Sequence, residues 1–416
     1  MGARHGRQPR RNLAKTLAKG VGVVAAVLLV ASAGVVAYAA ADLYGDIQRE
    51  PGFELEGEAA LEGVPDIGAM DGGVTFFVAG IDKRPDDGAF GDPEEESAVL
   101  NDVNMLVHIA QDHSHVEVVS FPRDMLVPVP ECADPADPEG EPLSSMSAVK
   151  INTVFEHGGI GCVVKTVESL VGVTIPFAGV VQFYGVAALS EAIGGVDVCL
   201  VDPIDDPYSG LALDAGHHTI SGMTALAYLR TRHGVGDGSD LGRISSQQAF
   251  MASLMRKVQD EGVLQDPIRL YSIAKAVTQN MQLSSRMQDP ATLVSIAKTV
   301  QDVDLSKIVF VQYPTVYTED MTAVEPSGSA LAVNQALQAD APISLSQTAT
   351  GDASFGTVAE SPAPEAPAEP APEAPTEGTT TDAPAAPVTE TPAQALPDDV
   401  TGQSGDEVRC ATANGG

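Results

Sequence analysis

One short stretch concentrates the residues that could do chemistry in this chain. It holds Arg230, Arg232 and Arg243 together with Asp240 and Gln247, in a protein with 23 Lys+Arg against 57 Asp+Glu. Guanidinium groups bind phosphate oxygens in a planar, two-pronged geometry. Asp240, Arg243 and Gln247 are spaced to lie along one side of a helix, and Arg230 and Arg232 can face one cleft if the chain is extended there. On its own, the stretch fits a phosphate site and a network of arginine–aspartate pairs equally well.

Further basic and polar residues follow other predicted elements. Arg123 and Asp124 come directly after a predicted strand at 115–121, and Lys150 and Asn152 open the sequence KINTVFEHGG. Ligands of α/β proteins collect where strands end. We therefore expect Arg123 and Lys150 to join the three arginines around a phosphate-bearing ligand, with Asn152 as a further substrate-binding residue.

Two carboxylates are expected beside this anion site. Asp82 follows a predicted strand at 74–80, and Asp102 opens the next strand. Mg²⁺ prefers oxygen ligands and is commonly held by one or two carboxylates, with substrate phosphates completing its coordination. The sequence therefore predicts that Asp82 and Asp102 bind Mg²⁺, which bridges them to the phosphate-bearing ligand.

The elements that must position these side chains alternate along the chain. Apolar runs predict strands, and apolar residues three and four apart predict helices. Ser221 is placed to cap one helix, and Gly194-Gly195 to end another. The alternation predicts an α/β fold, a mixed β-sheet flanked by helices on both faces, with an antiparallel hairpin across residues 111–114. The expected strands are 74–80, 103–110, 115–121, 175–183, 196–201 and 307–313, and the expected helices are 162–172, 184–195, 222–230, 240–261, 267–282 and 290–302.

The N-terminal residues predict a membrane anchor. Residues 1–19 contain six Lys/Arg and no acid, and residues 20–41 are apolar. Such a stretch is long enough to cross the bilayer as one helix. The basic flank places the N-terminus in the cytoplasm and the rest of this single-pass cell membrane protein outside. The alternative is a signal peptide cleaved after residues 37–39 (AYA), but the length of the apolar stretch favours the uncleaved anchor.

Composition divides the remainder of the chain into four parts. Residues 42–72 are charged and lack periodicity, as in a stalk, and residues 73–345 carry the predicted folded domain. Residues 346–405 are rich in Pro, Ala, Glu and Thr, a composition that predicts a disordered linker. The C-terminal segment 406–416 is then short, and only a disulfide is expected to tether it.

Four cysteines fit an exported protein in an oxidising compartment. Cys132, Cys162, Cys199 and Cys410 allow three pairings into two bridges, and none forms a CxxC sequence of the kind that binds zinc. We prefer Cys132–Cys162, which closes a Pro-rich loop, and Cys199–Cys410, which attaches the C-terminus to the domain.

The overall charge excludes one class of partner. The formal net charge is −34 at pH 7. Nucleic acid is a polyanion and would be repelled over most of such a surface. We expect no nucleic-acid partner.

Seven blocks in order resemble the LytR–CpsA–Psr family of cell-wall glycopolymer transferases, in its actinobacterial type. The resemblance covers residues 74–315 and the membrane-anchored layout. The blocks are GID, NDVNMLV, SFPRDM, KINTVFEHGG, EAIGGVDV, GHHTISGMTALAYLRTR and DLGRISSQQ.

The resemblance implies an α/β fold with an apolar channel for a polyprenyl chain. It implies transfer of a glycopolymer from polyprenyl pyrophosphate to peptidoglycan, with release of lipid phosphate. By position, Asp82 and Asp102 hold Mg²⁺, and Asp240 orients the arginines. The residues expected to bind the pyrophosphate are Arg123, Lys150, Arg230, Arg232, Arg243 and Gln247.

The chain departs from the family pattern at two positions. Leu100 and Ser246 stand where the family has arginine, and Arg84 in the neighbouring loop is the candidate replacement for the first. No residue stands out as the general base, although Asp124 is a candidate. Two rival functions remain open: hydrolysis of polyprenyl pyrophosphate with water as acceptor, and a non-catalytic regulator of the cell envelope that binds the lipid carrier.

Overall fold

The computed structural model describes residues 38–39, 41–47, 52–55, 74–82, 99–236, 238–288, 290–346, 357–358 and 392–414. The predicted anchor 20–41 lies outside these ranges except for Tyr38, Ala39 and Ala41, and so do Arg84 and most of the stalk and linker. The chain divides into two units, Met1–Glu50 and Pro51–Gly416. In the described part of the chain, no helix is both long and apolar enough to span a membrane.

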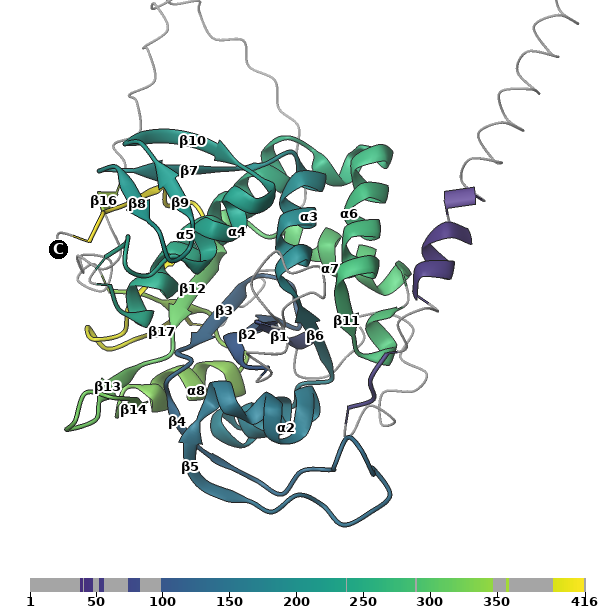
Figure 1. Cartoon of the computed structure of the whole chain (residues 1–416), viewed down its shortest axis with the longest axis vertical. Helices are drawn as coiled ribbons and strands as arrows, with labels where there is room; N and C mark the ends of the chain where they lie inside the picture. The colour runs from purple at the N-terminus through teal and green to yellow at the C-terminus, as the bar shows by residue number, and fades with distance from the viewer. Residues whose placement is uncertain are drawn as a thin grey trace, which may run out of the picture. The chain divides into compact units, whose positions relative to one another are not determined.

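A seven-stranded mixed sheet forms the centre of the larger unit (Figure 1). The first three strands form an antiparallel meander, and β6 and β12 add to it in parallel on either side. Parallel neighbours need long crossovers, which the helices of the chain provide. In sheet order the strands are β11 (Met281–Leu283), β6 (Phe177–Val181), β1 (Val74–Ile81), β2 (Asn101–Ile109), β3 (Val116–Phe121), β12 (Ile308–Gln312) and β18 (Gly402–Ser404).

Helices cover both faces of this sheet, as expected. Phe77 and Ala79 of β1 pack with α2 (Val154–Val171) and α8 (Ala330–Gln338) on one face. The other face packs against α5 (Asp240–Asp260) and α7 (Pro290–Asp302). Figure 1 shows α2 and α8 on one side of β1–β3 and α5 on the other. The other α-helices are α3 (Phe183–Ile193), α4 (Gly222–Arg230) and α6 (Pro267–Asn280).

Smaller elements surround the central layers. A second sheet has the order β10-β7-β19-β16, and the described residues form four further two-stranded pairs, three antiparallel and one parallel. The remaining strands are β4 (Leu126–Val129), β5 (Met146–Lys150), β7 (Val196–Leu200), β8 (Ile204–Asp206), β9 (Leu211–Leu213), β10 (Gly216–Ile220), β13 (Thr315–Tyr317), β14 (Val324–Pro326), β15 (Ile343–Ser344), β16 (Thr357–Val358), β17 (Gln394–Ala395) and β19 (Arg409–Ala411). The 3₁₀ turns are η3 (Ile151–Thr153), η4 (Val263–Gln265), η5 (Ser285–Gln288) and η6 (Leu305–Lys307).

One helix start and one helix cap differ from expectation. α2 begins at Val154 rather than at residue 162, because Gly158 and Gly159 take non-helical angles that interrupt the periodicity. Ser221 precedes α4, but its side chain makes no capping hydrogen bond. Instead the amide of Gly222 donates to the hydroxyl of Ser190 at 2.9 Å, so a residue of α3 satisfies this helix end.

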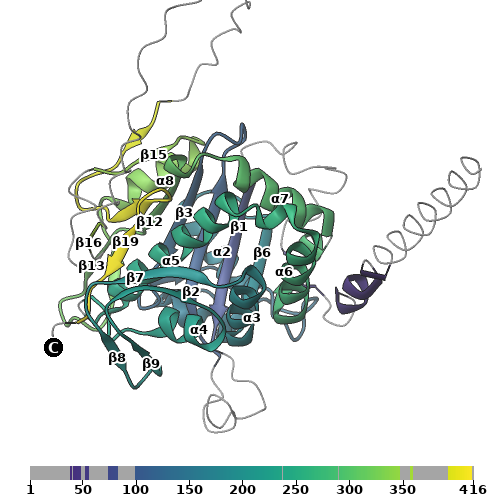
Figure 2. The ribbon, with the colours of Figure 1, turned by 90° about the horizontal axis from the view of Figure 1, so that it is seen from above.

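The predicted linker 346–405 is wrong at its C-terminal end. Residues 392–405 are placed in the fold: β17 pairs with β15, and β18 pairs with β12 as an edge of the central sheet. Strands of two or three residues show no readable alternation, so their composition resembled that of the linker. In Figure 2 the C-terminal strands lie beside β12 and β7.

The cysteines lie in the pairs that the sequence analysis preferred. Cys132 and Cys162 are bonded with a Cα–Cα distance of 5.3 Å, and Cys199 and Cys410 with 4.3 Å. The second bridge joins β7 to β19, which are parallel neighbours. The C-terminal segment is therefore attached both by main-chain pairing and by a disulfide.

Candidate active site

Asp240 connects two arginines of its own stretch, Arg232 and Arg243, to Arg123, which lies 117 residues before it. Asp240 is the first residue of α5, where the helix dipole favours a negative charge. Its carboxylate pairs with Arg243 at 2.6 Å and with Arg232 at 3.8 Å, and accepts a hydrogen bond from the amide of Arg123 at 3.1 Å. Asp240 therefore holds the start of α5, the loop after α4 and the end of β3 together.

Asp102, at the start of β2, also contacts two of these arginines. β2 and β3 are antiparallel, so the start of β2 lies beside the end of β3. Arg123 donates to the Asp102 carboxylate at 2.8 Å, and Arg243 donates to its carbonyl oxygen at 2.7 Å. Two carboxylates thus fix the positions of Arg123 and Arg243.

The charges within this cluster are unequally balanced. Burial disfavours the charged form of Arg123, but Asp102, Asp240 and Asp124 outweigh that effect and raise its pKa. The pKa of Arg232 is instead lowered, by burial and then by repulsion from Arg243 and Arg123. Arginine stays protonated in either case. Arg232 is therefore the cation whose charge an incoming anion would compensate most.

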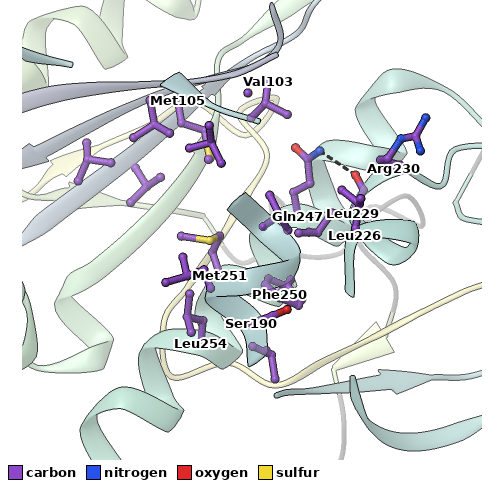
Figure 3. A pocket seen from close by; sticks show the side chains of 18 of the residues that line it. Val103, Met105, Ser190, Leu226, Leu229, Arg230, Gln247, Phe250, Met251 and Leu254 are labelled. Atoms are coloured by element: carbon purple, nitrogen blue, oxygen red, sulfur yellow. Dashed lines mark hydrogen bonds between the residues drawn. The ribbon is translucent and has the colours of Figure 1, made fainter. Parts of the chain in front are cut away.

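Arg230 and Gln247 complete one side of the site. α4 ends at Arg230, and Thr231 has an extended backbone. Arg230 and Arg232, on either side of Thr231, therefore both line one cavity of the domain. The Arg230 guanidinium lies 4.4 Å from the ring centroid of Phe183. Gln247 donates to the carbonyl of Leu229 at 3.0 Å, as Figure 3 shows, while Arg230 extends away from the apolar side chains below it.

Lys150 and Asn152 lie beside this cluster rather than in the cavity wall. Lys150 binds Asp124 at 2.8 Å, and neither Lys150 nor Asn152 is among the described residues that line the cavity. Burial raises the pKa of Asp124, but the hydrogen bond from Lys150 and the charge of Arg123 outweigh this effect, so the pKa lies below its ordinary value. A carboxylate with a lowered pKa is a weak base, so Asp124 is better suited to positioning Lys150.

Asp82 and Asp102 line the same cavity from neighbouring strands. The Asp82 carboxylate accepts from the amide of Leu100 at 3.0 Å. In the described ranges, no group of three or more His, Cys, Asp or Glu could hold a metal alone. Two carboxylates beside a cluster of arginines nevertheless fit Mg²⁺, which commonly takes its remaining ligands from phosphates and water.

A cavity of about 650 Å³ runs from this polar end into the domain. Past the arginines it is lined almost entirely by apolar side chains between β1–β3 and α5. Figure 3 shows Val103 and Met105 of β2 on one side, with Phe250, Met251 and Leu254 of α5 opposite. A ligand that fits this shape has an anionic head and a long apolar body.

Sequence reasoning missed Phe183 as a site residue. It lies two residues after the end of β6, as Arg123 does after β3, so the rule that drew attention to Arg123 could have found it. The two positions that depart from the family pattern lie outside the described cavity wall. Leu100 binds Asp82 through its amide, and Ser246 is buried within α5, where its hydroxyl donates to the carbonyl of Gly242 at 3.4 Å.

Comparison with known proteins identifies this arrangement. The model of the LytR_cpsA_psr family matches residues 39–340. The chain belongs to the LytR_cpsA_psr family. The matched residues include the site arginines, from Arg123 to Arg243, and the carboxylates of Asp102 and Asp240 that contact them. The match confirms the family expected from the seven sequence blocks.

Individual relatives of this LytR_cpsA_psr protein share about a third or less of their residues with it, over part of its length. The cell wall biosynthesis protein LcpA of Corynebacterium glutamicum is 31% identical over 240 residues, which cover 53% of this chain and 46% of LcpA. TagT of Bacillus subtilis, named a polyisoprenyl-teichoic acid–peptidoglycan teichoic acid transferase, is 26% identical over 261 residues, 60% of this chain and 74% of TagT. The chain thus spans less than half the length of LcpA.

A solved structure shares the fold. The LytR-Csp2A-Psr enzyme from Actinomyces oris superposes with a TM-score of 0.50 at 21% identity, over 64% of this chain and 90% of that one. This likeness confirms the mixed α/β architecture predicted from the sequence.

Proposed function

We propose that this protein transfers a cell-wall glycopolymer from a polyprenyl-pyrophosphate carrier to peptidoglycan. The observation that carries the proposal is the cavity: one end presents Arg123, Arg230, Arg232 and Arg243, and the remainder is apolar. A polyprenyl pyrophosphate has the same division between a dianionic head and a hydrocarbon chain. The names of LcpA, a cell wall biosynthesis protein, and of TagT, a transferase, support the same class of reaction.

The proposed reaction exchanges one phosphorus–oxygen bond for another. An acceptor hydroxyl attacks the phosphorus that carries the glycan, and the bond from this phosphorus to the lipid phosphate breaks. The lipid phosphate leaves with the bridging oxygen, and the proton of the hydroxyl passes to that phosphate or to water. Arg123, Arg232 and Arg243 are held in place before the substrate arrives, so they stabilise the growing charge of the leaving group without reorganisation.

Asp82 and Asp102 are proposed to hold Mg²⁺ when substrate is bound. The ion would supply Lewis-acid stabilisation of the phosphate oxygens. Asp102 already binds Arg123, so this residue also keeps the arginine beside the phosphate.

The proposed location follows from the carrier and the N-terminal sequence. A single membrane-spanning segment at 20–41 would keep the domain at the outer face of the membrane, where both the lipid carrier and peptidoglycan can reach it.

The test is a transfer assay with the full chain in lipid nanodiscs. The substrates are a labelled glycan on a short polyprenyl pyrophosphate, peptidoglycan fragments and Mg²⁺. Arg232→Ala should lower the rate by roughly 10²- to 10³-fold, as expected for loss of one preorganised donor. It should not lower the unfolding temperature, because Arg232 is repelled by its neighbours. Arg269→Ala, on the exposed side of α6 with its own ion pairs, is the matched control.

Three outcomes separate the functions. Label joined to peptidoglycan by wild type and lost in Arg232→Ala supports the transferase. Free phosphorylated glycan without linkage contradicts it and favours the hydrolase. Bound but unreacted lipid, with Mg²⁺ present, contradicts catalysis and favours the regulator that only binds the carrier.

A further inference from the structure

An exposed aromatic pair lies at the polar end of the cavity. Tyr208, in the β8–β9 turn, is 78% exposed, and its ring centroid lies 4.5 Å from that of His233. The two rings are inclined by 36°, and both residues line the cavity together with Arg232. The mechanism proposed above uses neither side chain.

Buried contacts fix this pair relative to the arginines. Asp206, only 2% exposed, accepts hydrogen bonds from the Tyr208 amide at 3.0 Å, the Ser209 hydroxyl at 3.1 Å and the Thr231 hydroxyl. Thr231 is fully buried between Arg230 and Arg232. One carboxylate therefore ties the turn that carries Tyr208 to the loop that carries Arg232.

Gly234 lets the two loops touch. A Cβ at this position would lie 2.6 Å from the Ile204 side chain and 3.1 Å from that of Asp206. Both distances are shorter than ordinary contacts, so a larger residue would push the loops apart. Close approach of these loops sets Tyr208 and His233 beside the phosphate-binding residues.

We propose that Tyr208, supported by His233, is the stacking surface for the first sugar of the transferred glycan. This inference rests on the proposed function, because it assumes a glycan attached to a pyrophosphate bound by the arginines. The sugar attached to a phosphate must lie next to that phosphate. A pyranose ring presents polarised C–H groups on its faces, and the negative face of an aromatic ring attracts them.

The position of the pair favours a sugar over the lipid chain. The hydrocarbon can bind in the apolar part of the cavity, which is lined by residues such as Met251 and Leu254. Tyr208 lies at the exposed end instead, where a ligand must combine apolar faces with hydroxyl groups that remain hydrated. The Ser209 hydroxyl, which also lines the cavity, can hydrogen-bond a hydroxyl group of the sugar.

The test compares two ligands on the full chain in nanodiscs: a short polyprenyl pyrophosphate that carries one N-acetylhexosamine, and the same lipid without a sugar. Tyr208→Ala should weaken binding of the glycosylated lipid by roughly 3- to 10-fold, the range for loss of one aromatic contact, and leave the sugar-free lipid unchanged. Tyr208→Phe should bind both as wild type does. Tyr317→Ala, an exposed tyrosine of β13 outside the cavity, is the control.

The outcomes distinguish this inference from the proposed function. If wild type binds both lipids and Tyr208→Ala weakens both equally or neither, the sugar site is refuted while the pyrophosphate site stands. If Tyr208→Ala alters only the KM for peptidoglycan fragments, the surface binds the acceptor and the inference is wrong. If wild type binds neither lipid, the proposed function fails and the sugar site with it.

Discussion

The substitution Asp240→Asn tests whether one carboxylate organises the arginines. One oxygen of Asp240 forms the ion pair with Arg243 at 2.6 Å, and the other accepts from the amide of Arg123 at 3.1 Å. Asparagine has the same shape but only one accepting oxygen, so if that oxygen keeps the bond from Arg123, its NH₂ group faces the guanidinium of Arg243. The substitution therefore removes a charge and the ion pair without creating a cavity.

The size of the effect follows from burial. The side chains of Arg243 and Asp240 are 5% and 10% exposed, so solvent screens the pair little. Removing one partner of a buried ion pair costs about 3–5 kcal/mol, because the other charge is left buried without its counter-charge. We expect a loss of about 3 kcal/mol in the free energy of unfolding, or roughly 5 °C in unfolding temperature for a domain of this size. Misplaced arginines should lower the transfer rate by roughly 10²-fold.

The assays are thermal unfolding and glycopolymer transfer on the full chain. Asp260→Asn is the matched control, because Asp260 lies at the opposite end of α5 and is exposed. An Asp240→Asn protein that unfolds at the wild-type temperature and keeps its rate would refute the role given to Asp240. Loss of stability with an unchanged rate would restrict that role to folding.

Further predictions address pH, the cavity and the C-terminal segment. Burial raises the pKa of Glu117 well above its ordinary value. The contribution of this residue to stability is therefore greatest below the unfolded-state pKa and declines as pH rises towards the folded-state pKa. Glu117→Gln should remove this decline in unfolding temperatures measured from pH 5 to 8, and parallel curves for the two proteins would contradict it. Met105→Trp should narrow the cavity and weaken binding of prenyl pyrophosphate at least 10-fold with little change in unfolding temperature, a result that unaltered binding would overturn. The double substitution Cys199→Ser and Cys410→Ser should cost about 2–4 kcal/mol in chemical denaturation, whereas equal stability would show that pairing of β19 with β7 suffices.

Local sequence signals predicted much of the fold and of the cluster. The spacing of Asp240, Arg243 and Gln247 predicted one side of a helix, and α5 begins at Asp240. The hairpin of β2 and β3 was predictable from its short connection, and it brings Asp102 next to Arg123. The start of β2 and the end of β3 lie at the same edge of the sheet, because the two strands are antiparallel neighbours. The positions of Asp102 and Arg123 relative to these strands were therefore enough to predict that they lie close together.

Long-range pairing was beyond the sequence. Tyr208 and His233 meet only because Asp206 and Thr231 join two loops, and neither loop has a periodic pattern. Lys150 was expected to bind the pyrophosphate directly. In the structure it pairs with Asp124 beside the cavity. The sequence does not show whether Lys150 prefers Asp124 or a phosphate as its partner. Its contact with substrate stays a prediction.

The C-terminal segment shows a second limit. The amide of Gly236 donates to Thr412 at 3.0 Å, and the amide of Asn414 donates to Gly234 at 3.2 Å. These bonds attach the C-terminus to the loop that follows Arg232, across more than 170 residues of chain. Three-residue strands carry no signal for such a contact, although the pairing of Cys199 with Cys410 pointed to the right place.

Photo-crosslinking tests the central claim, that one cavity holds the lipid chain with its pyrophosphate at the arginines. The probe is a prenyl pyrophosphate with a diazirine on its hydrocarbon chain, bound to the full chain in nanodiscs and mapped by mass spectrometry. We expect crosslinks to cavity residues such as Met105, Met251 and Leu254. These crosslinks should be lost on competition with farnesyl pyrophosphate and weakened in Arg232→Ala. Crosslinks confined to exposed apolar residues outside the cavity, such as Ile268 or Leu331, would contradict the claim.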